Sequence, residues 1–311
     1  MFYVVGLLVA SAVHAQSFPA KPIRMLVGYS AGGGADALAR LVAQKMSDTL
    51  GQQVLVENRP GAGATLAADA LAKAAPDGYT LYFADSAILI APAIYPKLPF
   101  DPLTSFSPVG GAVTTPLVVV VNPGIAAKNT QELISLLKSE PGKYSYGSPG
   151  VGTVHHLAME LFKKQAGVNI VHVPYKGASA IVPDVISGQL PIAIMSAPPA
   201  LAQSKAGRLR PIALTSPVKF AGAPDWPALA DTLPGFDAAP RLFILAPAGT
   251  PSGVISVLNN SLKTSLTALT DAFAAQGAAA DYSTPQELGQ RIADEVRKWA
   301  QVAKDAGAKA E

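Results

Sequence analysis

The sequence contains no cysteine, few charged residues and little net charge. Without cysteine, the chain cannot use thiol catalysis, cysteine-ligated zinc, iron–sulfur clusters or disulfide bonds. Lys and Arg number 24 against 21 for Asp and Glu, and the resulting charge of +3 does not favour nucleic acid as a partner. Charged residues make up 14% and hydrophobic residues 50% of the 311, which excludes a disordered chain and predicts about two folded domains.

Long hydrophobic runs are also absent, except at the N-terminus. Residues 1–13 are almost all apolar, and Val13-His14-Ala15 places small or medium residues at positions −3 and −1 of a signal-peptidase site. A membrane span needs about 20 residues, so the run is short for an anchor; a core strand is the other alternative. No Lys or Arg follows Met1, which departs from the usual basic start. We predict residues 1–15 as a signal peptide and the periplasm of a Gram-negative bacterium as the location.

Short apolar runs alternate with stretches in which apolar residues recur at helical spacing. Glycine and proline, 27 of each, add turn signals between them, as at Pro76-Asp77-Gly78. Such alternation predicts an α/β fold with mainly parallel sheets and helices on both faces. The predicted strands are residues 23–27, 53–57, 80–83, 113–121, 144–146, 170–173, 191–195, 210–215 and 242–246; the predicted helices include 130–139, 154–165, 252–275 and 285–306.

The order strand, glycine-rich loop, helix occurs twice, at residues 23–46 and 144–165. Two similar units predict two lobes, and the β-branched run at 113–121 and the predicted strand at 242–246 are the candidate crossings between them. The predicted lobe one therefore comprises residues 18–121 plus 242–311, and lobe two comprises residues 122–241.

The first glycine loop, residues 30–36, is a candidate anion site. It follows a predicted strand and opens a predicted helix. Glycines let backbone N–H groups face a ligand closely, and the first N–H groups of a helix favour an anion. The spacing matches neither a P-loop nor a dinucleotide fingerprint. The alternative is a tight turn in which Asp36 caps the helix.

The second glycine loop, residues 147–153, has the same position between strand and helix, and it adds the hydroxyls of Ser148 and Thr153. Ser86 follows the third predicted strand and belongs at the same edge of a sheet, because open α/β sheets bind ligands at the carboxyl ends of their strands. We predict these three hydroxyls as donors to a carboxylate. A flexible connection is the alternative for the second loop.

No combination of residues indicates catalysis, a metal site or a cofactor. His155 and His156 are adjacent, so on a helix they point about 100° apart, and neither has a further ligand at metal spacing. Ser148 is not part of a nucleophile-elbow motif. The histidines are either structural or, for His155 or His156, a ligand contact. Tyr29 either packs in the core or walls the ligand site.

Two strings of residues are highly specific when they occur together: Glu57-Asn58-Arg59-Pro60-Gly61-Ala62-Gly63 and Ala75-Pro76-Asp77-Gly78-Tyr79-Thr80-Leu81. Further matching strings run through most of the remaining chain: Phe18-Pro19, Gly32-Gly33-Gly34 with Asp36 and Arg40, Phe106-Ser107-Pro108-Val109, and residues 146–153, 173–177 and 246–251. With these strings the chain resembles the Bug-type receptors, which are the periplasmic substrate-binding proteins of tripartite tricarboxylate transporters.

The resemblance implies a two-lobed periplasmic binding protein, or Venus flytrap, with a ligand cleft between the lobes. Such receptors hold a carboxylated small molecule through backbone and hydroxyl donors of the two glycine loops. By that pattern, the ligand-binding residues are Ala31, Gly32, Gly33, Ser148 and Thr153, together with Ser86, which matches a position that usually carries a hydroxyl.

Two candidate positions depart from the family's pattern. Tyr29 stands where Phe is commoner and adds a hydroxyl near the cleft. Ser196 stands where an acidic residue is frequent, which removes a partner for a ligand amine. The cleft is therefore expected to prefer a simple or aromatic dicarboxylate over an amino acid. Asp184 is a further candidate near the cleft, with a helix surface as its alternative place.

The resemblance also implies a receptor rather than an enzyme. The expected protein is a monomer that captures a di- or tricarboxylate, aromatic ones included, and delivers it to the membrane subunits of a tripartite transporter. One alternative is a sensor that reports occupancy to a signalling partner. The other is a periplasmic hydrolase that uses Ser148 with His155 or His156.

Overall fold

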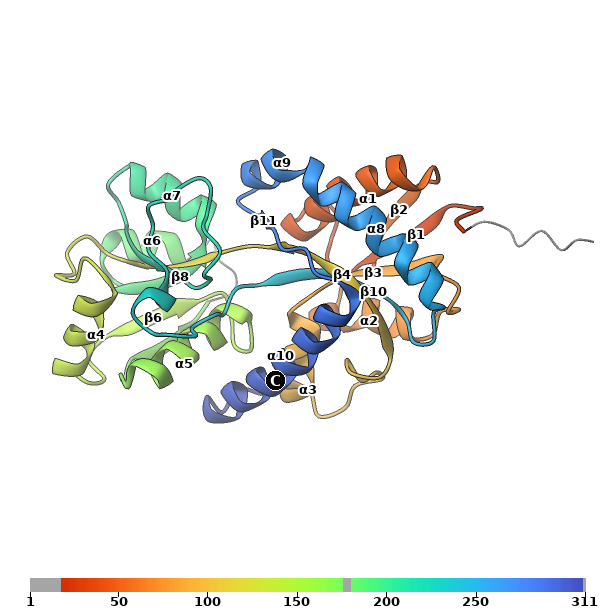
Figure 1. Cartoon of the computed structure of the whole chain (residues 1–311). Coiled ribbons are helices and arrows are strands. Elements are labelled where there is room, and N and C mark those ends of the chain that lie inside the picture. The colour runs from red at the N-terminus through yellow and green to blue at the C-terminus, as the bar shows by residue number, and fades with distance from the viewer. Residues whose placement is uncertain (1–17, 176–179, 310–311) are drawn as a thin grey trace, which may run out of the picture.

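The computed structural model describes residues 18–175 and 180–309 and shows two α/β lobes side by side (Figure 1). Each lobe is built on its own sheet, so the predicted two-lobed α/β fold is confirmed. Within the described residues, no helix combines the length and the apolar character needed to cross a membrane. The predicted signal peptide, residues 1–15, lies outside the described part of the chain.

Lobe one contains a six-stranded sheet in the order β11-β4-β10-β3-β1-β2. β1 pairs parallel with β2 and β3, whereas β10 pairs antiparallel with β3 and β4, and β11 pairs antiparallel with β4. The strands are β1 (Ile23–Val27), β2 (Val54–Asn58), β3 (Thr80–Asp85), β4 (Phe106–Thr114), β10 (Arg241–Pro247) and β11 (Ala279–Ala280).

The helices of lobe one cover both faces of this sheet. Leu38, Val42 and Met46 lie on one side of α1, as their spacing predicts, and all three are buried in one cluster with residues of β1 and α8. Residues of α2, α3 and α10 belong to a second cluster on the other face. The helices are α1 (Gly34–Leu50), α2 (Thr65–Ala72), α3 (Ala87–Ile94), α8 (Ser252–Ala268), α9 (Thr270–Ala275) and α10 (Pro285–Asp305).

Lobe two contains a five-stranded sheet in the order β7-β6-β8-β5-β9. β6 pairs parallel with β7 and β8, and β5 pairs antiparallel with β8 and β9. Its strands are β5 (Leu117–Val121), β6 (Ser145–Ser148), β7 (Val171–Pro174), β8 (Ile192–Ser196) and β9 (Arg210–Leu214), and its helices are α4 (Thr130–Ser139), α5 (Val154–Ala166), α6 (Ile181–Ser187) and α7 (Ala197–Lys205).

Both sheets are therefore mixed, whereas alternation of strands and helices predicts mainly parallel ones. The difference arises where the chain changes lobe. β4 leads directly into β5, and β10 returns from lobe two, so these strands are not joined to their neighbours by the helical crossovers that make a parallel pair.

The two crossings between the lobes run side by side. The chain leaves lobe one through Thr115 and Pro116 and returns at Pro240, and the N–H of Thr115 donates to the carbonyl of Pro240 at 3.0 Å. The predicted lobe one included residues 117–121, but β5 pairs within the sheet of lobe two. The boundary was missed because residues 113–121 are rich in β-branched residues throughout, and the break between the strands is marked only by Pro116, which has no N–H for a ladder.

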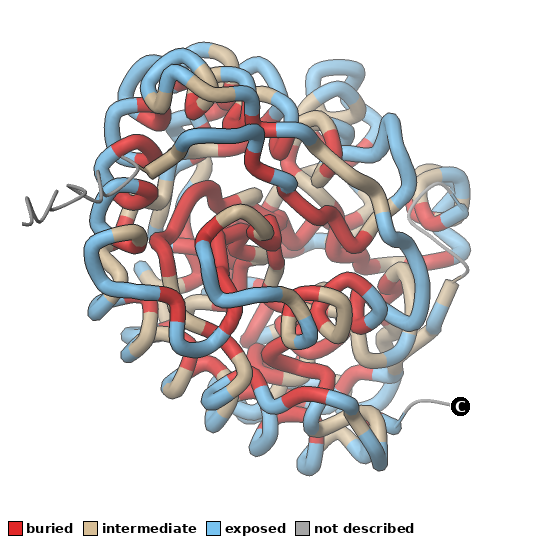
Figure 2. Tube along the Cα trace, turned by 90° about the vertical axis from the view of Figure 1, so that its right-hand side faces the viewer, coloured by how far each residue is buried: buried red, intermediate tan, exposed pale blue. Residues whose placement is uncertain are grey.

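One hydrophobic cluster continues from lobe one into lobe two. It contains Trp299 and Val302 of α10 together with Leu157 and Phe162 of α5. Beside this contact, the ammonium of Lys164 lies 2.7 Å from a carboxylate oxygen of Asp305. Figure 2 shows buried residues passing through the centre of the molecule, with exposed residues around them. The C-terminal helix is thus a second connection between the lobes, separate from the two crossings.

Candidate functional site

Two adjoining cavities lie where the chain passes between the lobes. They share Tyr29, Asp85, Thr115, Ser196 and Pro240, so residues of both lobes and of both crossings meet at their boundary. We call them compartment one, of about 330 Å³, and compartment two, of about 470 Å³. These volumes fit small-molecule sites, which commonly occur between domains.

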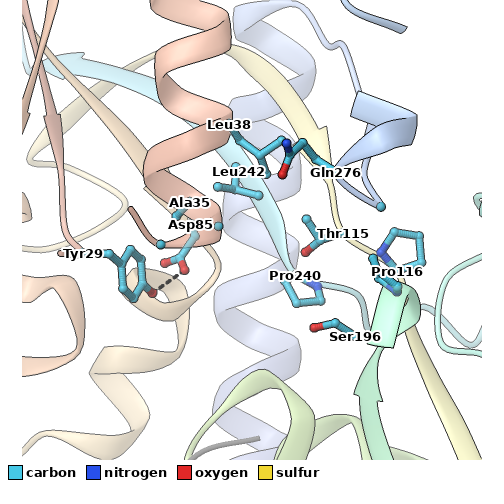
Figure 3. A pocket seen from close by; sticks show the side chains of 14 residues that line it. Tyr29, Ala35, Leu38, Asp85, Thr115, Pro116, Ser196, Pro240, Leu242 and Gln276 are labelled. Atoms are coloured by element: carbon cyan, nitrogen blue, oxygen red, sulfur yellow. Dashed lines mark hydrogen bonds between the residues drawn. The ribbon is translucent and has the colours of Figure 1, made fainter. Parts of the chain in front are cut away.

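Compartment one contains the start of α1 (Figure 3). Gly33, in an extended conformation with φ of −77°, is the N-cap residue, and no side chain caps the helix there. The first N–H groups of α1 therefore have no side-chain acceptor at this cavity wall. Besides the five shared residues, the lining consists of Gly33, Gly34, Ala35, Leu38, Pro116, Pro198, Leu242, Gln276 and Gly277.

Asp36 holds the first glycine loop from inside rather than capping the helix. Its buried carboxylate accepts hydrogen bonds from the backbone N–H of Gly32 at 2.9 Å, from Arg40 Nε at 2.9 Å and from Asn58 Nδ2 at 2.8 Å. The bond from Arg40 is the main reason that the pKa of Asp36 falls to about 2. The loop is therefore fixed by a charged contact behind it, while its front faces compartment one.

Compartment two is lined by the second glycine loop and by α3, and it is mostly apolar. Thr153 lines it, but its hydroxyl donates to the carbonyl of Gly150 at 2.8 Å. The same hydroxyl caps α5 by accepting the N–H of His156. His155 also lines this compartment; burial lowers its pKa to about 4, and its Nε2 has no hydrogen-bond partner among the described residues. The other lining residues are Gly63, Ala87, Ile90, Ala91, Ile94, Tyr95, Leu117, Pro149, Val151, Gly152 and Val154.

Tyr29 and Asp85 form a hydrogen-bonded pair at the boundary of the two compartments, and Figure 3 shows their side chains pointing at each other. The phenol of Tyr29 donates to one carboxylate oxygen of Asp85, and the backbone N–H of Ala87 donates to the other at 3.1 Å. Burial raises the pKa of Asp85, and burial together with this carboxylate raises the pKa of Tyr29. Tyr29 thus lines both compartments and also packs against the hydrophobic core of lobe one, which are the two places that the sequence left open for it.

Ser148 belongs to the second glycine loop, and the sequence predicts it as a ligand donor. It is fully buried and lines neither compartment, and its Oγ is 2.7 Å from Nε2 of His172. The ring of His172 stacks between those of Tyr146 and His156, at centroid distances of 4.9 and 4.0 Å. The serine that the hydrolase alternative needs is therefore paired with His172, not with His155 or His156.

Four other predicted residues also lie outside the lining of both compartments. The hydroxyl of Ser86 is buried and accepts the N–H of Arg241 at 3.0 Å. The carboxylate of Asp184 accepts the phenol of Tyr175 at 2.6 Å on α6. Ala31 and Gly32 precede the residues of the first loop that reach the cavity.

Contact with a ligand stays a prediction for the predicted residues that do line the compartments: Tyr29, Gly33, Thr153, His155 and Ser196.

Several lining residues were not predicted from the sequence. Asp85 ends β3, and its place at the carboxyl end of a strand is a usable signal, but the sequence predicts Ser86 beside it as the donor. Thr115 and Gln276 come from a crossing and from the end of α9, and no local pattern marks them. Among the described residues, no group of three His, Asp or Glu side chains lies close enough to hold a metal ion.

Known proteins resemble this chain over nearly its whole length. The profile of the tripartite tricarboxylate transporter family receptor matches residues 38–308. The protein BugT of Bordetella pertussis is 36% identical over 316 aligned positions, which cover 98% of this chain and 97% of BugT.

Solved structures share the fold as well. Rpa4515 of R. palustris, solved with adipate, has a TM-score of 0.76 and 30% identity, covering 94% of this chain and 100% of that one. MatC of Rhodopseudomonas palustris, with bound malate, has a TM-score of 0.71 and 28% identity, covering 92% and 99%. The resemblance found in the sequence is confirmed: this chain belongs to the receptor family of the tripartite tricarboxylate transporters, and it is a periplasmic solute-binding receptor rather than an enzyme.

Proposed function

We propose that this receptor captures a small carboxylated molecule between its lobes and delivers it to the membrane subunits of a tripartite transporter. The observation that carries the proposal is the cleft itself, in which the uncapped first turn of α1 faces residues of the other lobe. Backbone N–H groups at a helix start bind carboxylates without a formal cation. The relatives solved with adipate and malate give the ligand class independent support.

Closure of the lobes is the proposed signal to the membrane subunits. A ligand that contacts lobe one through Gly33 and Gly34 and lobe two through Ser196 or Thr153 gains its full set of contacts only when both lobes meet it. Its higher affinity for the closed arrangement shifts the population toward that arrangement. The two crossings, at Thr115-Pro116 and Pro240, are where the backbone bends in this proposal.

Three further parts of the proposal concern the whole chain. Residues 1–15 act as a signal peptide, so the exported protein begins at Gln16. The protein acts as a monomer. The lobes divide as predicted except that residues 117–121 belong with 122–241, in keeping with the pairing of β5.

A thermal-shift screen of the purified protein tests the ligand class. The panel contains C4–C6 dicarboxylates, tricarboxylates, acidic amino acids and aromatic carboxylates. A ligand present at about 100 times its dissociation constant adds about 2.7 kcal/mol of stability, which is easily seen as a rise in the unfolding temperature. We expect a carboxylate to give this rise and to be recovered unchanged. Stabilisation by neutral or cationic compounds alone would contradict the proposal.

Substitution of Gly34 by Val separates specific binding at the cleft from general stabilisation. A Cβ at Gly34 meets no atom within 4 Å, so the added side chain fits the fold but occupies compartment one beside the free N–H groups. We expect Gly34→Val to abolish the thermal shift. Gly253→Val is the matched control, because Gly253 lies in the first turn of α8, also meets no atom within 4 Å and lines neither compartment.

A further inference from the structure

Among the described residues that line the two compartments, Asp85 is the one Asp, Glu, Lys or Arg. It lines both of them, at the boundary where Tyr29 and Ser196 also lie. The remaining polar lining consists of hydroxyls, one amide, one histidine and backbone groups. The centre of the cleft therefore carries an acid without a basic residue beside it in the described lining.

The buried acids Asp36 and Glu295 each have a cationic partner, whereas Asp85, which is half-buried, has none among the described residues. Asp36 pairs with Arg40 at 2.9 Å, and Glu295 pairs with Lys298 at 2.5 Å. The groups that donate to Asp85 are the neutral phenol of Tyr29 and the backbone N–H of Ala87. A charge withdrawn from water is stabilised when an opposite charge pairs with it, so Asp85 favours a ligand that brings a cationic group.

Helix capping does not explain why this residue is an acid. Asp85 accepts the N–H of Ala87 at the start of α3, a contact that stabilises the helix end. Asn and Ser cap helices about as well as Asp does and carry no charge. Burial of the carboxylate raises its pKa, which means that the surroundings oppose the charge that a neutral cap would have avoided.

We infer that Asp85 determines specificity, and that the ligand is an amino-substituted carboxylate whose ammonium group donates to Asp85 while its carboxylate lies at the start of α1. The inference rests on the proposed function, because it assigns the second contact of the same ligand. It also reverses an expectation from the sequence. Ser196 was expected to leave the cleft without an acid for a ligand amine, but Asp85 brings an acid to the same boundary.

The same geometry disfavours a plain dicarboxylate. Compartment one and compartment two meet at Asp85, so a ligand that extends from the start of α1 into compartment two passes this carboxylate. A second carboxylate there would face a like charge, and the repulsion disfavours binding. An ammonium group at that position is attracted instead.

Isothermal titration calorimetry with matched ligands tests the inference directly. The pairs are glutamate with glutarate and 2-aminoadipate with adipate, and malate serves as a hydroxyl-bearing probe. We expect the amino-substituted member of at least one pair to bind at least tenfold more tightly than its plain partner. This comparison uses the unaltered protein, so it decides the matter even if a variant fails to fold.

Asp85→Asn removes the charge while keeping the oxygen that caps Ala87. We expect it to weaken binding of the amino-substituted ligand at least tenfold and to leave the plain dicarboxylate unchanged or tighter. Asp184→Asn is the matched control, because Asp184 also accepts a tyrosine phenol but lines neither compartment. It should change neither affinity.

The outcomes separate the inference from the proposed function. If plain dicarboxylates or malate bind as tightly as the amino-substituted ligands, or if Asp85→Asn leaves the preference intact, the role of Asp85 is refuted while the carboxylate receptor stands. If no carboxylate of either kind binds, the proposed function fails, and the inference fails with it.

Discussion

Mild acid should lower the free energy of unfolding of this protein, and His155 should account for part of that decrease. Burial lowers the pKa of His155 and of His172 to about 4, from an ordinary value of 6.5. Because the unfolded chain takes up protons at these sites first, the folded state is favoured fully above pH 6.5 and loses stability as the pH falls toward 4. The slope is about 1.4 kcal/mol per pH unit for each histidine.

The expected loss can be worked out for one histidine. Between pH 8 and pH 5, a group with these two pKa values costs about 2 kcal/mol of unfolding free energy, so both together cost about 4 kcal/mol. His155→Leu should remove about half of that loss. At pH 8 the substitution should cost little, because Nε2 of His155 has no hydrogen-bond partner to lose among the described residues.

Urea unfolding at pH values from 8 to 5, without ligand, measures this effect. The wild type and His155→Leu should have similar free energies of unfolding at pH 8 and diverge as the pH falls. If the two pH profiles run parallel, burial in compartment two does not hold His155 neutral.

Two further substitutions probe the first glycine loop and the contact between the lobes. Asp36→Asn removes the charge that holds Arg40; we expect a loss of about 1–2 kcal/mol near neutral pH that shrinks as the pH falls from about 4 to 2, measured by urea unfolding. In Gly277→Ala the new Cβ would lie 1.9 Å from Cγ of Pro198 on the other lobe, which is too close for both atoms to keep their places. We therefore expect Gly277→Ala to weaken ligand binding more than Gly307→Ala does. Both glycines have positive φ, but Gly307 meets no atom within 4 Å, so equal effects would show that the contact with Pro198 is unimportant.

Local patterns were enough to predict the first glycine loop. The apolar run, the glycines and the helical spacing all lie within residues 23–46, and the structure places β1 and α1 there. Gly33 reaches the cavity as expected. The interior contact of Asp36 with Arg40 is local too, and its i,i+4 spacing was visible in the sequence.

The role of Ser148 could not be predicted in this way. Its partner, His172, comes from the next strand of the sheet, and the parallel register sets Ser148 opposite Pro174 and Tyr146 opposite His172. That register depends on packing between segments about 25 residues apart and leaves no periodic signal. Asp85 illustrates the same limit, since its isolation from cations depends on which side chains from other segments reach the cleft.

The order of strands in lobe one has a consequence for the biogenesis of the protein. β10 lies between β3 and β4, so this sheet stays divided until residues 241–247 are available. All five strands of lobe two lie within residues 117–214 and are synthesised earlier. The first part of the chain to be synthesised is thus completed after the middle part, and α10, which packs on both lobes, is added last.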